Sequence, residues 1–262
     1  PLKGCKVAVL VKTTDLTETL VFHSFRLSDD EASSETSYLQ TLALFKKYID
    51  YLDEQGLDMK THLVRTWIYI SDIDVNYGGV VKARNDIFAH YGLTADTHYI
   101  ASTGIGGESQ SRHACVAMDF LTYPNIVENQ KKYLQALDHL DPTHDYGVAF
   151  ERATRLDTGC ARHYYVSGTA SIDRHGNVLH LGDVKLQAER LIENIRALLA
   201  DGDAKLSDIR YLIVYLRDIS DYHAVDTIFR QHFPSTPYII VHAKVCRPEW
   251  LIETECIAEK DC

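Results

Sequence analysis

The sequence predicts an α+β protein of two similar halves, each a mixed β-sheet with two helices packed on one face. Two observations lead to this prediction: an ordered internal repeat, and an alternation of apolar segments with helical and strand periodicity in both copies. The repeat pairs residues that lie 146 positions apart: Ile49 with Ile195, Leu52 with Leu198, Gly56 with Gly202, Tyr69 with Tyr215, Asp72 with Asp218, and Ile73 with Ile219.

Beyond this block the repeat distance falls to 141, which pairs residues 87–88 with residues 228–229 (both Ile-Phe). The first copy therefore carries five extra residues, around positions 75–79. We divide the chain into an N-terminal domain (1–124), a polar connecting segment (125–146) and a C-terminal domain (147–262).

Each half is expected to contain one long amphipathic helix, which ends at a glycine. The apolar positions with helical spacing are Leu39, Leu42, Phe45, Ile49 and Leu52 before Gly56, and Leu191, Ile195 and Leu198 before Gly202. Shorter helices are expected near residues 78–91 and 221–232, and another at 127–137 in the connecting segment.

Runs rich in β-branched and aromatic residues predict the strands. They cover residues 7–12, 20–27, 63–70, 98–103 and 113–120 in the first half, and 148–155, 163–172, 209–216, 238–245 and 250–258 in the second. With both helices on one face, each sheet has an opposite face left to pack against the other half or further copies. We therefore expect clefts at the seams.

Composition narrows the class of protein. With 45% hydrophobic and 24% charged residues in 262, the chain is expected to be globular rather than disordered or fibrous. A net charge of −10 without a basic run argues against a nucleic-acid partner. No segment reaches about 20 apolar residues, and the first residues lack the layout of a signal peptide, so we expect a cytoplasmic protein with no membrane partner.

The cysteine and histidine patterns predict neither a disulfide framework nor a metal site. Six cysteines include no CxxC pair, which favours free thiols, and thirteen histidines include no HExxH motif. We expect no metal and no cofactor.

Three stretches of the second half resemble the Rid (YjgF/UK114) superfamily, and more closely its chorismatase branch. They are residues 167–172 (SGTASI), residues 180–183 (HLGD) with Gln187 and Asn194 following, and residues 245–253 (VCRPEWLIE). Chorismatases are similar in having two Rid-like halves, of which the first is degenerate. The first half adds residues 65–69 (RTWIY), Tyr77, residues 83–85 (ARN) and residues 103–106 (TGIG), which look like stretches of that branch.

The resemblance implies two tandem Rid-like (chorismate mutase-like) domains, and assembly as a homotrimer or a pseudo-trimer. It also implies a cofactor-independent hydrolase or lyase that acts on chorismate, or a similar small carboxylated enol ether, and releases pyruvate. Such a substrate requires guanidinium groups for its carboxylates and a carboxylic acid that protonates the enol ether. Burial between two sheets would raise the pKa of that acid.

The resemblance assigns Glu253 as the general acid and places Cys246 on the reacting face. Arg84 would clamp a carboxylate, with Tyr77 as a hydrogen-bond partner. Arg247 would either do likewise or pair with an acidic residue for structure. The substrate-binding set is completed by Gly168 and Ala170, and Gly168 is also expected to let the backbone pass close to another segment.

Other interpretations of these residues remain open. Glu253 and Glu255 would share a solvent-exposed face if the period-2 alternation of their strand turns them outward. Cys246 is equally well explained as a packed, inert thiol. The glycines at 104, 106 and 107 are interpreted as turn residues, because a strand rather than a helix follows them.

Two other functions also remain open. The first is a Rid-type enamine or imine deaminase. Such deaminases resemble one another in an arginine shortly after a proline, whereas here Tyr238 follows Pro237, and tyrosine lacks a fixed positive charge. The second is a non-catalytic protein that binds a small carboxylate. The endoribonuclease L-PSP label used in this superfamily gains little support from an acidic chain.

Overall fold

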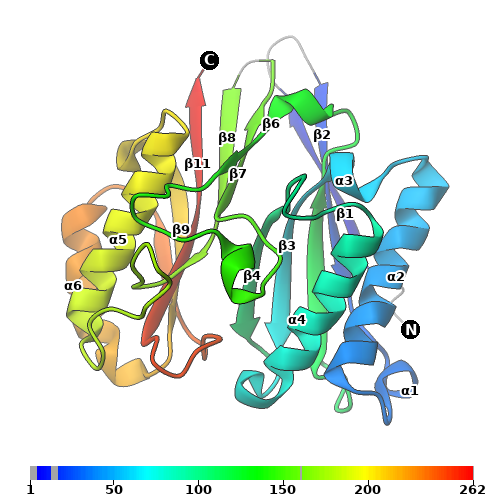
Figure 1. Cartoon of the computed structure of the whole chain (residues 1–262), viewed down its shortest axis with the longest axis horizontal. Helices are drawn as coiled ribbons and strands as arrows, with labels where there is room; N and C mark the ends of the chain where they lie inside the picture. The colour runs from blue at the N-terminus through cyan, green and yellow to red at the C-terminus, as the bar shows by residue number, and fades with distance from the viewer. Residues whose placement is uncertain (1–4, 13–16, 160, 262) are drawn as a thin grey trace.

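The computed structural model describes residues 5–12, 17–159 and 161–261. Two β-sheets lie between outer helices, with the helices of the first half on the right of Figure 1 and those of the second half on the left. The predicted α+β class, with helices on one face of each sheet, is confirmed.

The first sheet is mixed, because β3 and β4 run parallel while its other neighbouring strands are antiparallel. Its strands are, in spatial order, β1 (Cys5–Lys12), β2 (Thr17–Phe25), β5 (Val116–Thr122), β3 (Leu63–Ile70) and β4 (Ala101–Gly106). The helices of this half are α1 (Asp29–Ala32), α2 (Ser37–Gln55), α3 (Met59–His62) and α4 (Ile73–His90).

The second sheet has the same mixed character, with β9 and β10 parallel. Its strands are, in spatial order, β10 (Tyr238–His242), β9 (Ile209–Leu216), β11 (Ile252–Asp261), β8 (Ala161–Thr169), β7 (Ala153–Asp157) and β6 (Lys131–Leu134). Its helices are α5 (Val184–Asp201) and α6 (Tyr222–His232), and single 3-10 turns are η1 (Glu128–Gln130), η2 (Thr143–Tyr146), η3 (Leu206–Asp208) and η4 (Ile219–Asp221).

The long helices begin and end where capping chemistry predicts. Thr36 Oγ1 accepts a hydrogen bond from the Leu39 N–H at the start of α2 (3.3 Å), and Asp183 caps the start of α5 in the same way. Gly56 ends α2 with φ of 67°, a left-handed conformation that glycine adopts without steric cost. The predicted helix end at Gly56 is confirmed, and β3 and β9 cover the predicted residues 63–70 and 209–216.

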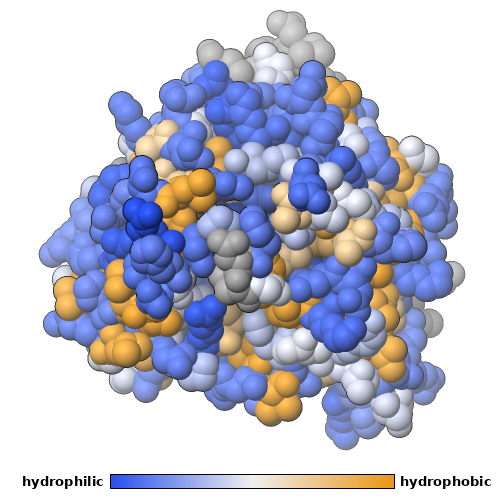
Figure 2. All heavy atoms as spheres, in the orientation of Figure 1, coloured by the Kyte–Doolittle hydropathy of each residue, from blue (hydrophilic) through white to orange (hydrophobic). Residues whose placement is uncertain are grey.

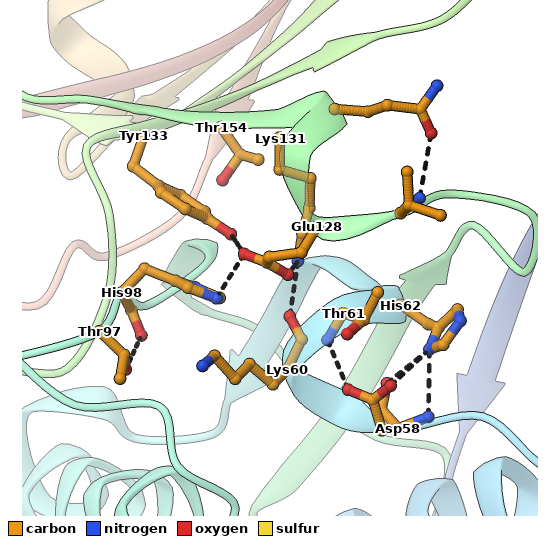
Figure 3. Close-up of polar contacts among 12 residues, drawn as sticks. Asp58, Lys60, Thr61, His62, Thr97, His98, Glu128, Lys131, Tyr133 and Thr154 are labelled. Atoms are coloured by element: carbon orange, nitrogen blue, oxygen red, sulfur yellow. Dashed lines mark hydrogen bonds and ion pairs between the residues drawn. The ribbon is translucent and has the colours of Figure 1, made fainter.

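The connecting segment forms a strand, so the helix predicted at residues 127–137 is wrong. Strand β6 pairs with β7 and adds an edge to the second sheet. Lys131 lies buried in it, donates to the backbone oxygen of Lys60 (2.6 Å) and lies 3.4 Å from Glu128 (Figure 3). Glu128 also accepts from the Tyr133 hydroxyl (2.6 Å). These polar contacts replace the water that a lysine normally keeps around its ammonium group. Burial nevertheless lowers the pKa of Lys131 to about 8.

The extra residues of the first copy lengthen a helix. Helix α4 has 18 residues and begins at Ile73, earlier than predicted, whereas its counterpart α6 has 11. Tyr77 therefore lies in the early turns of α4 rather than in a loop.

The two halves are joined by a shared apolar cluster and by backbone hydrogen bonds. Buried residues between the sheets are Val64, Ala101 and Leu121 from the first half, Tyr123 and Ile126 after β5, and Leu156 and Tyr165 from the second half. The N–H of Glu151 donates to Ile100 O, and that of Gly106 donates to Lys244 O, both at 2.8 Å. The halves therefore form one continuous seam.

The face of the molecule in Figure 2 is mostly hydrophilic, with apolar side chains gathered in small separate groups. In the described ranges, none of the helices combines the length and the apolar character needed to cross a bilayer.

Candidate functional site

A cavity of about 280 Å³ lies at the seam between the two halves. The first half contributes Tyr77, Arg84, Ser102 and Gly104; the second contributes Val148, Phe150, Arg152, Gly168, Ala170, Ile172, Cys246, Arg247, Trp250 and Glu253. All seven residues predicted from the sequence line this one cavity. Its volume is close to the lower end of the range of about 300–1,000 Å³ that is typical of small-molecule sites.

Glu253 is the buried acid of the cavity. It lies on β11 opposite Tyr215 of β9, and only 4% of its surface is exposed. Within the described part of the chain, its carboxyl group has no hydrogen-bond or ion-pair partner. Burial, together with the nearby Glu255, raises the pKa of Glu253 to about 8, although Arg152 acts in the opposite direction. The carboxyl group is therefore mostly protonated at neutral pH.

Glu255 lies on the same side of β11 as Glu253, as period-2 alternation requires, but both side chains are buried at the seam. The alternative in which both glutamates face solvent is wrong, because this side of β11 is covered by the first half. Glu255 Oε2 lies 2.7 Å from Arg65 Nη2, and Glu255 Oε1 accepts from Trp67 Nε1 (2.8 Å). A carboxylate bound in this way is fixed.

Gly168 leaves the space that the Glu253 side chain occupies. A Cβ atom added at Gly168 would lie 1.9 Å from Glu253 Oε1 and 3.1 Å from Thr103 Cγ2. The Gly168 N–H donates to Thr103 Oγ1 of the first half, across the seam (3.0 Å). The predicted close approach at Gly168 is confirmed. The pairing of β8 with β11 shifts register at this point, and such bulges redirect side chains.

Two arginines lie near one aromatic ring in the cavity wall. The guanidinium carbons of Arg84 and Arg152 lie 5.6 and 5.5 Å from the centre of the Phe150 ring. Arg84 is 3% exposed, with Nη1 3.5 Å from Ser102 Oγ, so it is not a surface residue of its helix. Arg152 Nη2 lies 2.7 Å from Asp141 Oδ1. Arg152 donates from both Nε and Nη2 to Asp141, which compensates its charge. A wall with one compensated and one further guanidinium group suits a ligand that carries a carboxylate.

Sequence reasoning missed Arg152 and Phe150. Their signal was weak, because the predicted strand 148–155 carries three charged residues, Glu151, Arg152 and Arg155, and nothing in the pattern singles out Arg152. Sequence reasoning also misplaced Gly104 and Gly106, which lie in β4 rather than in a turn. A Cβ at Gly104 would lie 3.3 Å from Tyr77 Cε2, so this glycine makes room for the tyrosine.

Cys246 and Tyr77 meet in the cavity from opposite halves. Each of the two side chains influences the pKa of the other, and an isolated bridge between Ile105 and Val245 holds the neighbouring backbone in place. Burial raises the pKa of Cys246 to about 12 and also raises the pKa of Tyr77. Both groups therefore keep their protons at neutral pH, and Cys246 is a thiol rather than a thiolate.

The HLGD stretch and the helix after it support the cavity walls. Gln187 Oε1 accepts from the Leu251 N–H (2.9 Å), and Gln187 Nε2 donates to Glu249 O (3.0 Å). Asn194 Nδ2 donates to the backbone oxygens of Ala170 (3.1 Å) and Ile172 (3.2 Å). These two amides of α5 therefore fix the segments that carry Glu253 and Ala170.

Arg247 packs its guanidinium carbon 4.9 Å from the Trp250 ring at the cavity. Tyr238, the residue after Pro237, lies outside the cavity lining, and its hydroxyl donates to Asp226 Oδ1 (2.7 Å). Among the described residues, no group of three or more His, Cys, Asp or Glu is placed to hold a metal ion.

Comparison with known proteins agrees with this architecture. Residues 150–260 match the profile of the Endoribonuclease L-PSP family. The 3-aminoacrylate deaminase RutC of Acinetobacter baylyi is 30% identical over 96 residues, which are 36% of this chain and 76% of RutC. A RutC family protein of Pyrococcus abyssi is 34% identical over 99 residues, which are 37% of this chain and 78% of the relative.

The crystal structure of a chorismatase matches the whole two-sheet arrangement. It superposes with a TM-score of 0.71 and 22% identity, over 96% of this chain and 78% of the chorismatase chain. At this identity the likeness establishes the fold. The chain therefore belongs to the Rid superfamily, and its two tandem Rid-like domains have the fold of chorismatase.

Proposed function

We propose that this protein is a chorismatase-like hydrolase that cleaves the enol ether of chorismate, or of a similar small carboxylated metabolite, and releases pyruvate. The observation that carries the proposal is the buried, protonated Glu253 carboxyl group in a cavity that also contains two guanidinium groups. The fold shared with chorismatase supports it.

Arg84 and Arg152 bind the substrate carboxylates in this proposal. A guanidinium offers two parallel N–H donors to a carboxylate, which fixes orientation as well as charge. Both guanidinium groups lie about equally far from the Phe150 ring, 5.6 and 5.5 Å from its centre. A substrate that carries carboxylates and a ring therefore suits this wall. Arg247, Gly168 and Ala170 complete the walls against which the substrate packs.

Glu253 supplies the proton for the chemical step. The carboxyl proton moves to the methylene carbon of the enolpyruvyl group, and the ether carbon becomes an oxocarbenium ion. Water adds to that carbon and returns a proton to the Glu253 carboxylate. The resulting hemiketal breaks into pyruvate and the ring alcohol. An acid with a pKa near 8 suits this role, because at pH 7 roughly nine in ten molecules hold the proton.

Cys246 and Tyr77 act as neutral neighbours of the reacting group. Because its pKa is raised to about 12, Cys246 serves as a contact rather than as a nucleophile. Tyr77 lines the same cavity from the first half. The cavity then needs only one group that changes its protonation state.

The test is to incubate the purified protein with chorismate and follow pyruvate through lactate dehydrogenase and NADH oxidation. Glu253→Gln keeps the size of the side chain and removes the acid, and we expect pyruvate release to fall by about 10²–10⁴-fold. The matched control is Glu259→Gln, which changes a half-exposed glutamate on the same strand and should leave the rate unchanged. Wild-type release that persists in Glu253→Gln would remove Glu253 from the mechanism.

A second candidate is a deaminase of the RutC type, which the identity of 30% to that protein favours. In this reaction Glu253 would position the water that attacks an imine. Ammonia release from 3-aminoacrylate, without pyruvate release from chorismate, would support this function instead.

Homotrimeric or pseudo-trimeric assembly and a cytoplasmic location remain predictions. Light scattering coupled to size-exclusion chromatography would test the assembly, and fractionation of cells would test the location.

A further inference from the structure

Outside the cavity lining, a buried ion pair joins the two halves two residues along β11 from the acid. Arg65, on β3 of the first half, and Glu255, on β11 of the second, are 1% and 3% exposed. We propose that the Arg65–Glu255 pair is a positioning device for Glu253, which fixes the acid on β11 and sets the pH range in which it holds its proton. The inference rests on the proposed role of Glu253 as the acid, but its test does not require turnover.

The geometry links the pair to Glu253 along two routes. Along the strand, Glu255 lies two residues from Glu253 on the same side, a separation of about 6.6 Å between Cα atoms. Across the seam, Arg65 Nη2 donates to Thr103 Oγ1 (2.7 Å), and Thr103 Oγ1 accepts from the Gly168 N–H (3.0 Å). Gly168 is the residue against which Glu253 Oε1 lies. A change at Arg65 or Glu255 therefore affects both strand β11, which carries Glu253, and Gly168, against which the Glu253 carboxyl group lies.

The pair has more contacts than an ordinary ion pair. Arg65 Nη1 donates to Val166 O at the bulge of β8 (2.7 Å), and its guanidinium carbon lies 4.7 Å from the Trp67 ring. Trp67 Nε1 donates to the second oxygen of Glu255 (2.8 Å). Both carboxylate oxygens are therefore held by the first half. Replacing a buried pair with apolar residues is often neutral for stability, so retention of such a pair is consistent with a task besides folding.

The charges around Glu253 make the direction of the effect predictable. The titratable or charged side chains that act on it or are affected by it are Glu255 on its own strand, Arg152 before β7, Tyr215 on β9, Cys246 after β10, and Tyr77 on α4. Two further cations, Arg84 and Arg247, line the same cavity. Of these, Glu255 is the neighbour whose negative charge favours the protonated form of Glu253. Removing that charge also leaves Arg65 without its anion, so both changes favour the ionised form of Glu253.

The experiment measures the titration of Glu253 directly. Protein labelled with ¹³C at the glutamate carboxyl carbon is titrated by NMR, and the Glu253 signal is assigned by its loss in Glu253→Gln. We expect Glu255→Gln to lower the measured pKa of Glu253 by at least about one pH unit, and Arg65→Gln to raise it. Glu259→Gln, at the exposed end of the same strand, should leave it unchanged.

A milder variant keeps the test usable if a buried charge change prevents folding. Trp67→Phe changes no charge but removes the N–H that binds Glu255, together with part of the ring beside Arg65, and should shift the titration of Glu253 by a few tenths of a pH unit. Opposite shifts in Glu255→Gln and Arg65→Gln support the inference. A Glu253 titration that stays the same in folded Glu255→Gln, or in Trp67→Phe if neither charge variant folds, overturns it. Such shifts in a protein that releases no pyruvate from chorismate would instead reject the proposed function alone.

Discussion

The two halves share a fold but carry different residues at equivalent positions of their last strands. Tyr69 of β3 pairs with Ala117 of β5, and its repeat partner Tyr215 of β9 pairs with Glu253 of β11. Ala117 thus occupies the place that Glu253 holds in the second half. By the same register, Asp119 of the first half corresponds to Glu255, and it lies 2.8 Å from Arg26 rather than at the cavity.

Strands β2 and β8, which pair with β5 and β11 respectively, differ in length at this point. Between equivalent pairs, β8 has two residues, Ser167 and Gly168, where β2 has one, Ser24. The extra residue makes the bulge that accommodates the Glu253 side chain. The first half instead carries the five extra residues that place Tyr77 in α4. The second half therefore holds the acid, while the first half supplies a tyrosine and an arginine to the wall.

The largest expected effect tests the bulge. In Gly168→Ala the new Cβ would lie 1.9 Å from Glu253 Oε1, so the carboxyl group must move. Because that group is the end of a flexible side chain, we expect a small change in Tm. A misplaced acid should nevertheless lower kcat/KM for pyruvate release by about 10²-fold. Activity within threefold of wild type would show that the half-specific bulge does not position the acid.

The second prediction concerns the acid of the second half, which should make the free energy of unfolding depend on pH. Glu253 binds its proton in the folded state up to a pKa of about 8, whereas in the unfolded chain its pKa is near 4.5. The folded state therefore holds the extra proton between these values, and stability falls as pH rises through that range. Relative to wild type, Glu253→Gln should gain roughly 4 kcal/mol in the free energy of unfolding between pH 5 and pH 8.5. Urea denaturation at both pH values measures this gain, and an equal difference at both would contradict the raised pKa.

The third prediction tests the contribution of the first half. Arg84→Lys keeps the charge but loses the planar, two-pronged donor, so KM for chorismate should rise about 10-fold to 30-fold with a smaller change in kcat. Arg112→Lys, at an exposed position of the same half, is the control. An unchanged KM would mean that the first half supplies only a wall.

The smallest effect concerns the extra residues of α4. Gly78 has no atoms within 4 Å of an added Cβ, so Gly78→Ala should stabilise the protein by roughly 0.4–1 kcal/mol through helix propensity. Gly79→Ala should destabilise it, because its Cβ would lie 2.9 Å from the backbone nitrogen of Tyr38 on α2. Thermal denaturation compares the two, and equal effects would show that α4 does not pack tightly on α2 at this point.

Much of the fold could be predicted because its signals are local. The apolar spacing of α2 and α5 and the β-branched runs of β3 and β9 depend only on neighbouring residues. The connecting strand β6 could not be predicted in this way, because its two lysines suggest an exposed segment. Lys131 is buried there through partners far away in the sequence, such as the backbone oxygen of Lys60.

The site residues that lie in sequence motifs could be predicted, whereas those that depend on contacts formed in the folded chain could not. Glu253, Cys246 and Arg84 lie in stretches that resemble a family, so they could be named without a structure. The direction of the Glu253 side chain could not, because alternation says which residues share a side but not what covers that side. Arg152 lacked a motif, and its place in the wall depends on Asp141 and Phe150, which only the folded chain brings together.

The connection of the two domains in one chain has a further consequence for symmetry. In a ring of identical subunits, every substitution is repeated at every seam, so a residue that improves one wall also alters the opposite wall. Two domains in one chain are free of that constraint. Tyr77 and Arg84 can change on one side of the cavity while Glu253 and Gly168 stay fixed on the other. The cost is that the chain forms one such cavity at this seam, where a symmetric dimer would form two.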